Sequence, residues 1–184
     1  RKVLEEIKQR LHLQRLPQRM ECFDISHTQG EETVASCVVF GPEGPLKSDY
    51  RRFNITDVQA GDDYAAMRQA LNRRYTRVQK GEAPVPDLLI VDGGKGQLSA
   101  ALKSLDDLEL RGKIAIIGIA KRLEELFYPN DPIPLYLDKK SETLKIIQQL
   151  RNEAHLFGIE HHRNKRSKTA LNSELESITG IGEK

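Results

Sequence analysis

Two aspartates and one histidine are the residues whose types and expected positions could do chemistry together. Asp24 lies near the end of a predicted strand, Asp92 directly follows the apolar run 88–91, and His155 lies on a predicted long helix. In open α/β sheets, sites form beyond the carboxyl ends of the strands. Two close carboxylates repel unless a cation separates them, and Mg²⁺ or Mn²⁺ prefers oxygen ligands. We therefore expect a divalent-metal site; the structural alternatives are a polar strand position for Asp24, helix capping by Asp92 and a helix-surface position for His155.

The elements that must position these residues are a sheet and its covering helices. Apolar alternation and turn signals predict three strands in an antiparallel meander, at residues 20–26, 33–40 and 46–55. Helical and strand patterns then predict, in order, a helix over 64–80, a strand over 88–91, a helix over 98–105, strands over 113–120 and 135–137, and a helix over 141–157. This order predicts an α/β fold with a mixed sheet, the meander being followed by parallel strands, and helices on both faces.

The glycine-rich loop Gly93-Gly94-Lys95-Gly96 directly follows Asp92. It matches neither GxxxxGK[ST] nor GxGxxG, the two common phosphate-binding patterns. Its glycines would let the backbone approach a phosphate or a metal at a helix start, and Lys95 would neutralise a phosphate. A nucleotide-phosphate-binding protein that uses this loop is the less favoured alternative, because no Ser or Thr follows Gly-Lys.

Basic residues gather in two runs, although the net charge is only +2, from 29 basic and 27 acidic residues. Between Tyr64 and Lys80 there are several arginines and no acid, and the run from Arg163 to Lys168 is also free of acids. Such runs indicate either a footprint for a polyanion or a solvated helix face.

The composition points to a globular chain of 184 residues, one domain with a fragment of another. No apolar run approaches the ~20 residues of a bilayer span, so no membrane partner is expected. No signal peptide is visible, and the chain begins with Arg, so we expect a piece of a longer protein. The two cysteines, Cys22 and Cys37, lie in predicted strands; we expect free thiols in a reducing compartment, the cytoplasm.

Five motifs, in this order, make the chain from Met20 onward similar to the UvrC family, the nuclease subunit of the bacterial UvrABC excinuclease. They are Glu21–His27, Gly61–Met67, Val91–Gln97, Arg151–His155 and His162–Arg166. The resemblance is to the C-terminal half of that family. It implies an RNase H-like endonuclease fold that makes the 5′ incision at damaged double-stranded DNA, with a divalent metal, Mg²⁺ or Mn²⁺.

The resemblance also implies roles for individual residues. Asp24, Asp92 and His155 correspond to the catalytic set, and Asp63 to a supporting position. Asp24 and Asp92 are the expected metal ligands, whereas His155 has two open roles, metal ligand or proton-transfer group. The family's usual Asp is replaced by Asn152 in the Arg-Asn-Glu-Ala-His motif, which disfavours a metal ligand at position 152.

The expected domain organisation follows from the same resemblance. Its parts are a lead-in helix or linker at 1–19, the endonuclease domain at 20–162, a basic linker at 163–173 and the start of a truncated helix-hairpin-helix domain at 174–184. The predicted DNA contacts are Lys95, Arg163, Lys165, Arg166, Gly180 and Gly182. UvrB is the implied protein partner, reached through the parent chain, and a non-catalytic DNA-binding module is the main alternative function.

Overall fold

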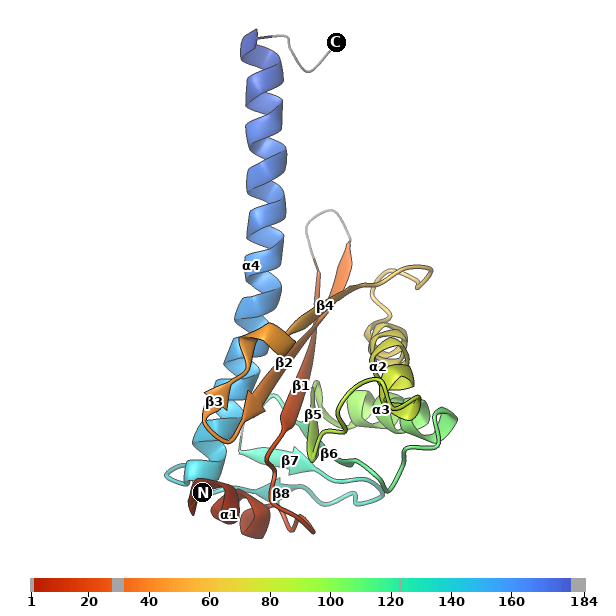
Figure 1. Cartoon of the computed structure of the whole chain (residues 1–184), viewed down its shortest axis with the longest axis vertical. Coiled ribbons are helices and arrows are strands. Elements are labelled where there is room, and N and C mark those ends of the chain that lie inside the picture. The colour runs from red at the N-terminus through yellow and green to blue at the C-terminus, as the bar shows by residue number, and fades with distance from the viewer. Residues whose placement is uncertain (1, 28–31, 123, 180–184) are drawn as a thin grey trace.

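One mixed β-sheet runs through the molecule, with helices on both of its faces (Figure 1). The structure is a computed structural model that describes residues 2–27, 32–122 and 124–179, with side chains described as far as residue 160. Its helices are α1 (Lys2–Arg10), α2 (Asp63–Gln79), α3 (Gly94–Asp107), α4 (Glu142–Thr179) and the 3₁₀ turn η1 (Lys47–Asp49). Its strands are β1 (Met20–His27), β2 (Thr33–Gly41), β3 (Gly44–Pro45), β4 (Arg51–Asn54), β5 (Leu88–Asp92), β6 (Ala115–Ile119), β7 (Glu125–Phe127) and β8 (Leu135–Tyr136).

The strand order across the sheet is β3-β2-β1-β5-β6-β7-β8, with β4 also paired to β2. The pairs β1–β2 and β2–β4 are antiparallel, whereas β1–β5 and β5–β6 are parallel. A meander therefore leads into parallel strands at the centre of the sheet, and the predicted fold class is confirmed. The central position of β5 explains its unbroken apolar run, because a strand covered on both faces needs no polar side.

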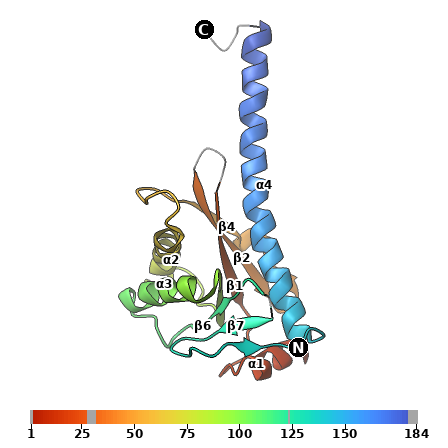
Figure 2. The same cartoon turned by 180° about the vertical axis from the view of Figure 1, so that it is seen from behind.

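The helices divide between the two faces of the sheet. Helix α4 packs against β1 and β2, while α2 and α3 pack against each other and against the sheet. Figures 1 and 2 show α4 on one side of the sheet and the α2–α3 pair on the other. Successive side chains of a strand point to opposite faces. Phe23 contacts Tyr75 of α2, so its neighbour Asp24 points to the face that α4 covers.

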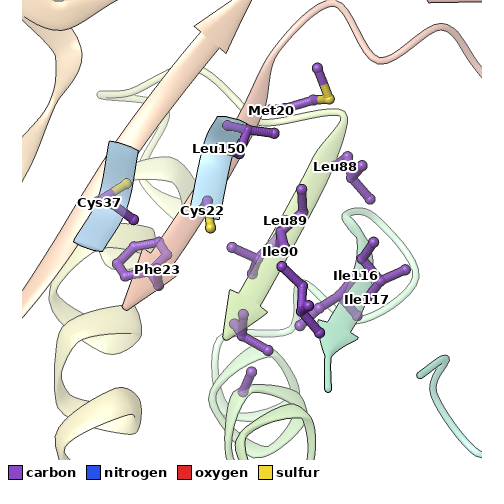
Figure 3. Packing of buried hydrophobic residues seen from close by; sticks show 14 of the residues in the cluster. Met20, Cys22, Phe23, Cys37, Leu88, Leu89, Ile90, Ile116, Ile117 and Leu150 are labelled. Atoms are coloured by element: carbon purple, nitrogen blue, oxygen red, sulfur yellow. The ribbon is translucent and has the colours of Figure 1, made fainter. Parts of the chain in front are cut away.

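The core is mainly aliphatic and joins strands to both helical layers. Figure 3 shows buried side chains of neighbouring strands, with Cys22 of β1, Ile90 of β5 and Ile117 of β6 in register across the sheet. Leu150 of α4 belongs to the same buried cluster. Cys22 and Cys37 are buried and free, as expected from the sequence. Such close-packed strands hold the backbone ends that carry Asp24 and Asp92 in one position.

The third strand of the meander is shorter than the sequence predicts. Residues 46–55 were expected to alternate along one strand, but the structure breaks this segment into η1 and β4. In this turn, Oδ2 of Asp49 accepts a hydrogen bond from Nη1 of Arg19 at 2.8 Å. The alternation of residue types did not reveal this side-chain pairing.

Helix α4 is longer than the sequence predicts. Its expected end near Phe157 is wrong, because the helix continues to Thr179 and residues 163–173 are helical. This stretch is polar, which indicated a linker, but it contains neither Pro nor Gly and is rich in helix-forming residues. A polar stretch does not need to pack against a core, but it can still form a helix. The division of the chain into domains at 162 and 173 stays a prediction.

Among the helices that the structure describes, none is both long and apolar enough to cross a bilayer.

Candidate active site

A cleft of about 480 Å³ opens where β1 and β5 end. Its walls come from the end of β1, the turn before α2, the end of β5 and the start of α3. The residues that line it are Asp24, Ile25, Gly61, Asp62, Asp63, Tyr64, Asp92, Gly93 and Gln97. Two predicted catalytic residues and the predicted supporting residue therefore share one cavity.

The parallel pairing of β1 with β5 places Asp24 and Asp92 side by side. Phe23 lies opposite Val91 in the ladder, so the next residues along the two strands are the two aspartates. Both strands run in the same direction, and their carboxyl ends therefore meet at one edge of the sheet. This adjacency is the one that the sequence predicts.

Asp24 is almost fully buried, and its environment disfavours the charged form. Its pKa is raised to about 6, mainly by burial and then by the negative charge of Asp92. The positive charges available at His155 and Arg151 oppose this rise in the pKa. Among the described residues, Oδ2 of Asp24 has no hydrogen-bond partner. This oxygen is a buried acceptor beside a cleft, with its bonding capacity unused.

Helix α4 brings two basic side chains to the aspartates. Nε of Arg151 donates to Oδ2 of Asp92 at 3.2 Å, and Nδ1 of His155 lies 3.6 Å from Oδ2 of Asp24. The two residues are four positions apart, so they lie on the same side of the helix. The sequence identified His155 but gave Arg151 no role, although the spacing of four to His155 was a usable signal.

The donor set fits a hard divalent cation. Oδ2 of Asp24, which accepts no hydrogen bond from the described residues, and the neighbouring carboxylate of Asp92 supply oxygen ligands, and His155 offers one nitrogen beside them. Mg²⁺ is commonly held by one or two carboxylates, with water and substrate phosphates completing its shell. Within the described part of the chain, no three His, Cys, Asp or Glu side chains are grouped closely enough to hold a metal by themselves. The site would therefore depend on water or phosphate oxygens for its remaining ligands.

Sequence comparison matches residues 8–159 of this chain to a family described as the UvrC RNAse H endonuclease domain. The chain belongs to the UvrC family. It is 64% identical to the UvrABC system protein C of Christiangramia forsetii over 100% of this chain and 31% of that relative. The identity to the protein of the same name from Porphyromonas gingivalis is 56%, over 99% of this chain and 30% of the relative. The chain thus spans about a third of the length of these UvrC relatives.

Solved structures give more distant similarities. A crystal structure of human ENDOV aligns with a TM-score of 0.43 at 15% identity, over 81% of this chain and 86% of that chain. The RuvC structure of Thermus thermophilus aligns with a TM-score of 0.32 at 11% identity, over 56% of this chain and 64% of that one. Both scores are below 0.5, so the assignment to the UvrC family rests on the sequence matches.

Asp63, the supporting residue implied by UvrC, lies on the wall of the cleft formed by α2. Its carboxylate Oδ1 accepts a hydrogen bond from Nε2 of His27 at 2.7 Å, and Nδ1 of His27 is 3.2 Å from Oγ1 of Thr33. Nε2 of Gln97 donates to the backbone oxygen of Asp63 at 3.0 Å. His27 was part of the recognised motif, but nothing local to it indicated a partner 36 residues away.

The glycine-rich loop lies at the start of α3, as expected, and its approach to a phosphate or a metal stays a prediction. A Cβ at Gly93 would lie 2.5 Å from Cγ of Gln97, and a Cβ at Gly96 would overlap the ring of Tyr64. These two glycines make room for cleft side chains. Nζ of Lys95 donates to the backbone oxygen of Pro132 at 2.9 Å and lies 5.2 Å from the ring centroid of Phe127. Lys95 is not among the cleft residues, and its DNA contact stays a prediction.

The remaining predicted DNA contacts lie at the end of the chain. Arg163, Lys165 and Arg166 belong to helical turns of α4, but their side chains are outside the described part of the structure. Gly180 and Gly182, predicted from the helix-hairpin-helix pattern, lie outside the described residues altogether.

Proposed function

We propose that this chain is the endonuclease domain that makes the 5′ incision at damaged DNA, in a reaction that depends on Mg²⁺ or Mn²⁺. The observation that carries the proposal is the pair Asp24–Asp92, side by side at the edge of a cleft, with a buried carboxylate oxygen of Asp24 that accepts no hydrogen bond from the described residues. Membership of the UvrC endonuclease-domain family supports the same chemistry. UvrB would be met through the parent chain, in the cytoplasm of a bacterium.

The carboxylates would hold the cation. When bound there, it would polarise the scissile phosphate and lower the pKa of a coordinated water. Arg151 holds Oδ2 of Asp92 in place, which leaves the other oxygen of that carboxylate for the site. Two negative side chains alone would repel a DNA strand, so their use in a nuclease is consistent with a cation between them and the phosphate.

His155 is placed to bind or move a proton next to Asp24. Its Nδ1 lies 3.6 Å from Oδ2 of Asp24, and its side chain is 62% exposed, so solvent and substrate can reach it. Proton transfer by a positioned side chain contributes about 10²- to 10⁴-fold to a rate. From this position His155 could act either as a metal ligand or as a proton-transfer group.

Geometry disfavours the two alternative functions. A phosphate-binding loop at 93–96 would need a cation directed at the phosphate, whereas Lys95 is bonded to Pro132. A non-catalytic DNA-binding module would have no use for two adjacent acids in its cleft. An ATP titration that shows no binding would remove the nucleotide alternative.

The deciding experiment is the substitution Asp92→Asn in the full-length protein. Incision of a lesion-bearing duplex by the reconstituted UvrABC system should fall by at least about 10²-fold, because the variant keeps its shape and loses a charged ligand. Asp106→Asn is the matched control, since Asp106 pairs with Arg111 at the surface outside the cleft. Incision at the parental rate by the Asp92→Asn protein, at non-saturating Mg²⁺, would refute the assignment.

A further inference from the structure

Tyr64 is an exposed aromatic residue on the wall of the candidate active site. It is the second residue of α2, it lines the same cleft as Asp24 and Asp92, and it is 54% exposed. Within the described residues, its hydroxyl group makes no hydrogen bond. A large ring left open to solvent beside a carboxylate pair has no role in the core and is available to a ligand.

The absence of a side chain at Gly96 leaves the space that the ring of Tyr64 occupies. Gly96 lies in α3, and a Cβ added there would come within 2.7 Å of Cε1 of Tyr64 and overlap the rest of the phenol. Gly96 is not among the glycines with positive φ, so its backbone does not require glycine. An alanine would also be the better helix former. The missing side chain at Gly96 therefore serves the position of Tyr64.

We propose that Tyr64, seated on Gly96, is a substrate-contacting residue whose ring stacks on the base next to the incised phosphate. The inference rests on the proposed function, because it places the phosphate at Asp24 and Asp92 and the adjoining nucleotide on the neighbouring wall. Aromatic rings stack on any base, which gives strand contact without sequence preference. The base must be out of the duplex stack when the strand is cut.

A second exposed side chain continues this wall along α2. Arg68 is four residues after Tyr64 and so lies on the same side of the helix. Among the described residues, no ion pair engages its guanidinium group. Proteins that bind single-stranded nucleic acid combine aromatic rings, on which the bases stack, with basic side chains, which contact the phosphates.

The first test separates the ring from the hydroxyl group in the full-length protein. Tyr64→Phe should incise a lesion-bearing duplex within about twofold of the parent, and Tyr64→Ala should lose about 5- to 150-fold in kcat/KM, the range of one base–aromatic contact. Tyr136→Ala is the matched control, because Tyr136 is 65% exposed on β8 outside the cleft. A Tyr64→Ala protein as active as the Tyr136→Ala protein would overturn the proposal.

The second test uses the seat of the ring. Gly96→Ala should leave the melting temperature unchanged or higher, since only the far end of a side chain must move, and should lose incision to the same extent as Tyr64→Ala. The double variant with Tyr64→Ala and Gly96→Ala should incise no more slowly than Tyr64→Ala alone, because the atoms nearest to the added Cβ at position 96 all belong to the tyrosine side chain. A loss from Gly96→Ala that persists in full without the tyrosine would show that the glycine serves the loop itself, against the proposal.

The third test changes the substrate. An abasic tetrahydrofuran nucleotide is placed on either side of the incised phosphate, one position at a time. At one of the two positions it should reduce incision by the parent as much as Tyr64→Ala does, and it should have no further effect on the Tyr64→Ala protein. Independent, multiplicative losses at both positions would refute stacking.

Failure of the two proposals would look different. Parental incision by the Asp92→Asn protein would overturn the endonuclease site and the stacking inference with it. An inactive Asp92→Asn protein together with a fully active Tyr64→Ala protein would leave the endonuclease site standing and refute only the role of Tyr64.

Discussion

Two carboxylates on neighbouring parallel strands repel each other, and in this chain the repulsion raises the pKa of Asp24. Burial and the charge of Asp92 raise the pKa of Asp24 to about 6, whereas Arg151 bonds directly to Asp92. The result is an acid that is costly to ionise and whose Oδ2 lacks a hydrogen-bond partner among the described residues, with Nδ1 of His155 3.6 Å away. Such strain is typical of groups that serve a ligand, because a bound cation removes the repulsion that the empty fold must carry.

Asp24→Asn should stabilise the metal-free chain. The folded-state pKa of about 6 lies above the ordinary value of 3.8, so Asp24 contributes most stability below about pH 4 and loses it as pH rises to about 6. Above pH 6 the variant should have a higher free energy of unfolding, by up to about 3 kcal/mol, and the difference should vanish near pH 4. Urea unfolding of both proteins from pH 4 to 7.5 measures this.

Mg²⁺ supplies the complementary measurement for Asp24. It should raise the melting temperature of the parent chain at pH 7.5, because ligand binding to the folded state stabilises it, and should leave the Asp24→Asn variant unchanged. Equal stabilisation of both proteins by Mg²⁺ would place the cation elsewhere, and a variant less stable than the parent at pH 7.5 would contradict the assigned repulsion.

His155→Ala should lose about 10²- to 10⁴-fold of the incision rate while the fold is kept. His155 is exposed on a long helix, and alanine favours helix formation. Calorimetric titration with Mn²⁺ decides between its two roles: retained affinity assigns proton transfer, and lost affinity assigns a ligand. Asn152→Ala, an exposed position on the same helix, is the control, and parental incision by His155→Ala would remove His155 from the site.

At the scale of elements, the site is assembled by where helices begin and how closely they approach the sheet. Helix α2 starts at its cap Asp62, whose side chain accepts from the backbone N of Ala65, and this start carries Asp63 and Tyr64 into the cleft. Helix α4 approaches β1 and β2 closely at Gly158, where a Cβ would lie 2.9 Å from Oγ of Ser26 and 3.1 Å from Oγ of Ser36. That approach sets the distance between His155 and Asp24.

Gly158→Leu should push α4 away from β1 and β2. The added side chain has no space, so we expect a loss of about 1–3 kcal/mol in the free energy of unfolding. Incision should also fall, because His155 lies one turn earlier on the same helix. Leu156→Ala, at an exposed position of α4, should change stability by less than about 0.5 kcal/mol. Unchanged stability and incision in the Gly158→Leu protein would show that this contact does not position α4.

At the scale of the whole molecule, α4 extends well beyond the sheet that it covers (Figure 1). Its first half packs against β1 and β2 and carries Arg151 and His155. Its second half contains the basic run from Arg163 to Lys168. A continuous helix joins this run to the residues at the cleft, so the two are connected by a stiff element.

The basic run should add affinity for DNA without sequence preference. Replacing Arg163, Lys165 and Arg166 with Ala should reduce the slope of log affinity against log salt by about two to three units, because each phosphate contact contributes about 0.9. Binding is measured in an Asp92→Asn background so that the duplex stays intact.

The matched control for the basic run replaces three exposed lysines at or just before the start of α4, Lys139, Lys140 and Lys145. It removes the same charge and should change the slope little. An equal change from both triple variants would mean that only net charge matters, and an unaltered slope in the first would remove the run from the DNA-binding surface.

The sequence by itself determined the central part of the site. The apolar run 88–91 predicted a strand covered on both faces, and parallel neighbours that end at one edge of the sheet would bring Asp24 and Asp92 together, as the pairing of β1 with β5 does. Helical spacing placed His155 on a covering helix. These conclusions need only local patterns and the direction of strands. The end of α4 was missed because hydrophobic periodicity marks only the part of a helix that packs against a core. The polar stretch 163–173 has no such periodicity, although it is helical and contains neither Pro nor Gly.

Only the tertiary structure decided which side chains meet across the cleft. Arg151 reaches Asp92 over 59 residues, and His27 reaches Asp63 over 36. Tyr64 rests on Gly96, a residue of the loop that the sequence predicted to approach a phosphate or a metal. Each of these contacts depends on the rotation of a helix about its axis and its distance from the sheet. Packing of the whole core sets both quantities, and the pattern of residues within a single element does not contain them.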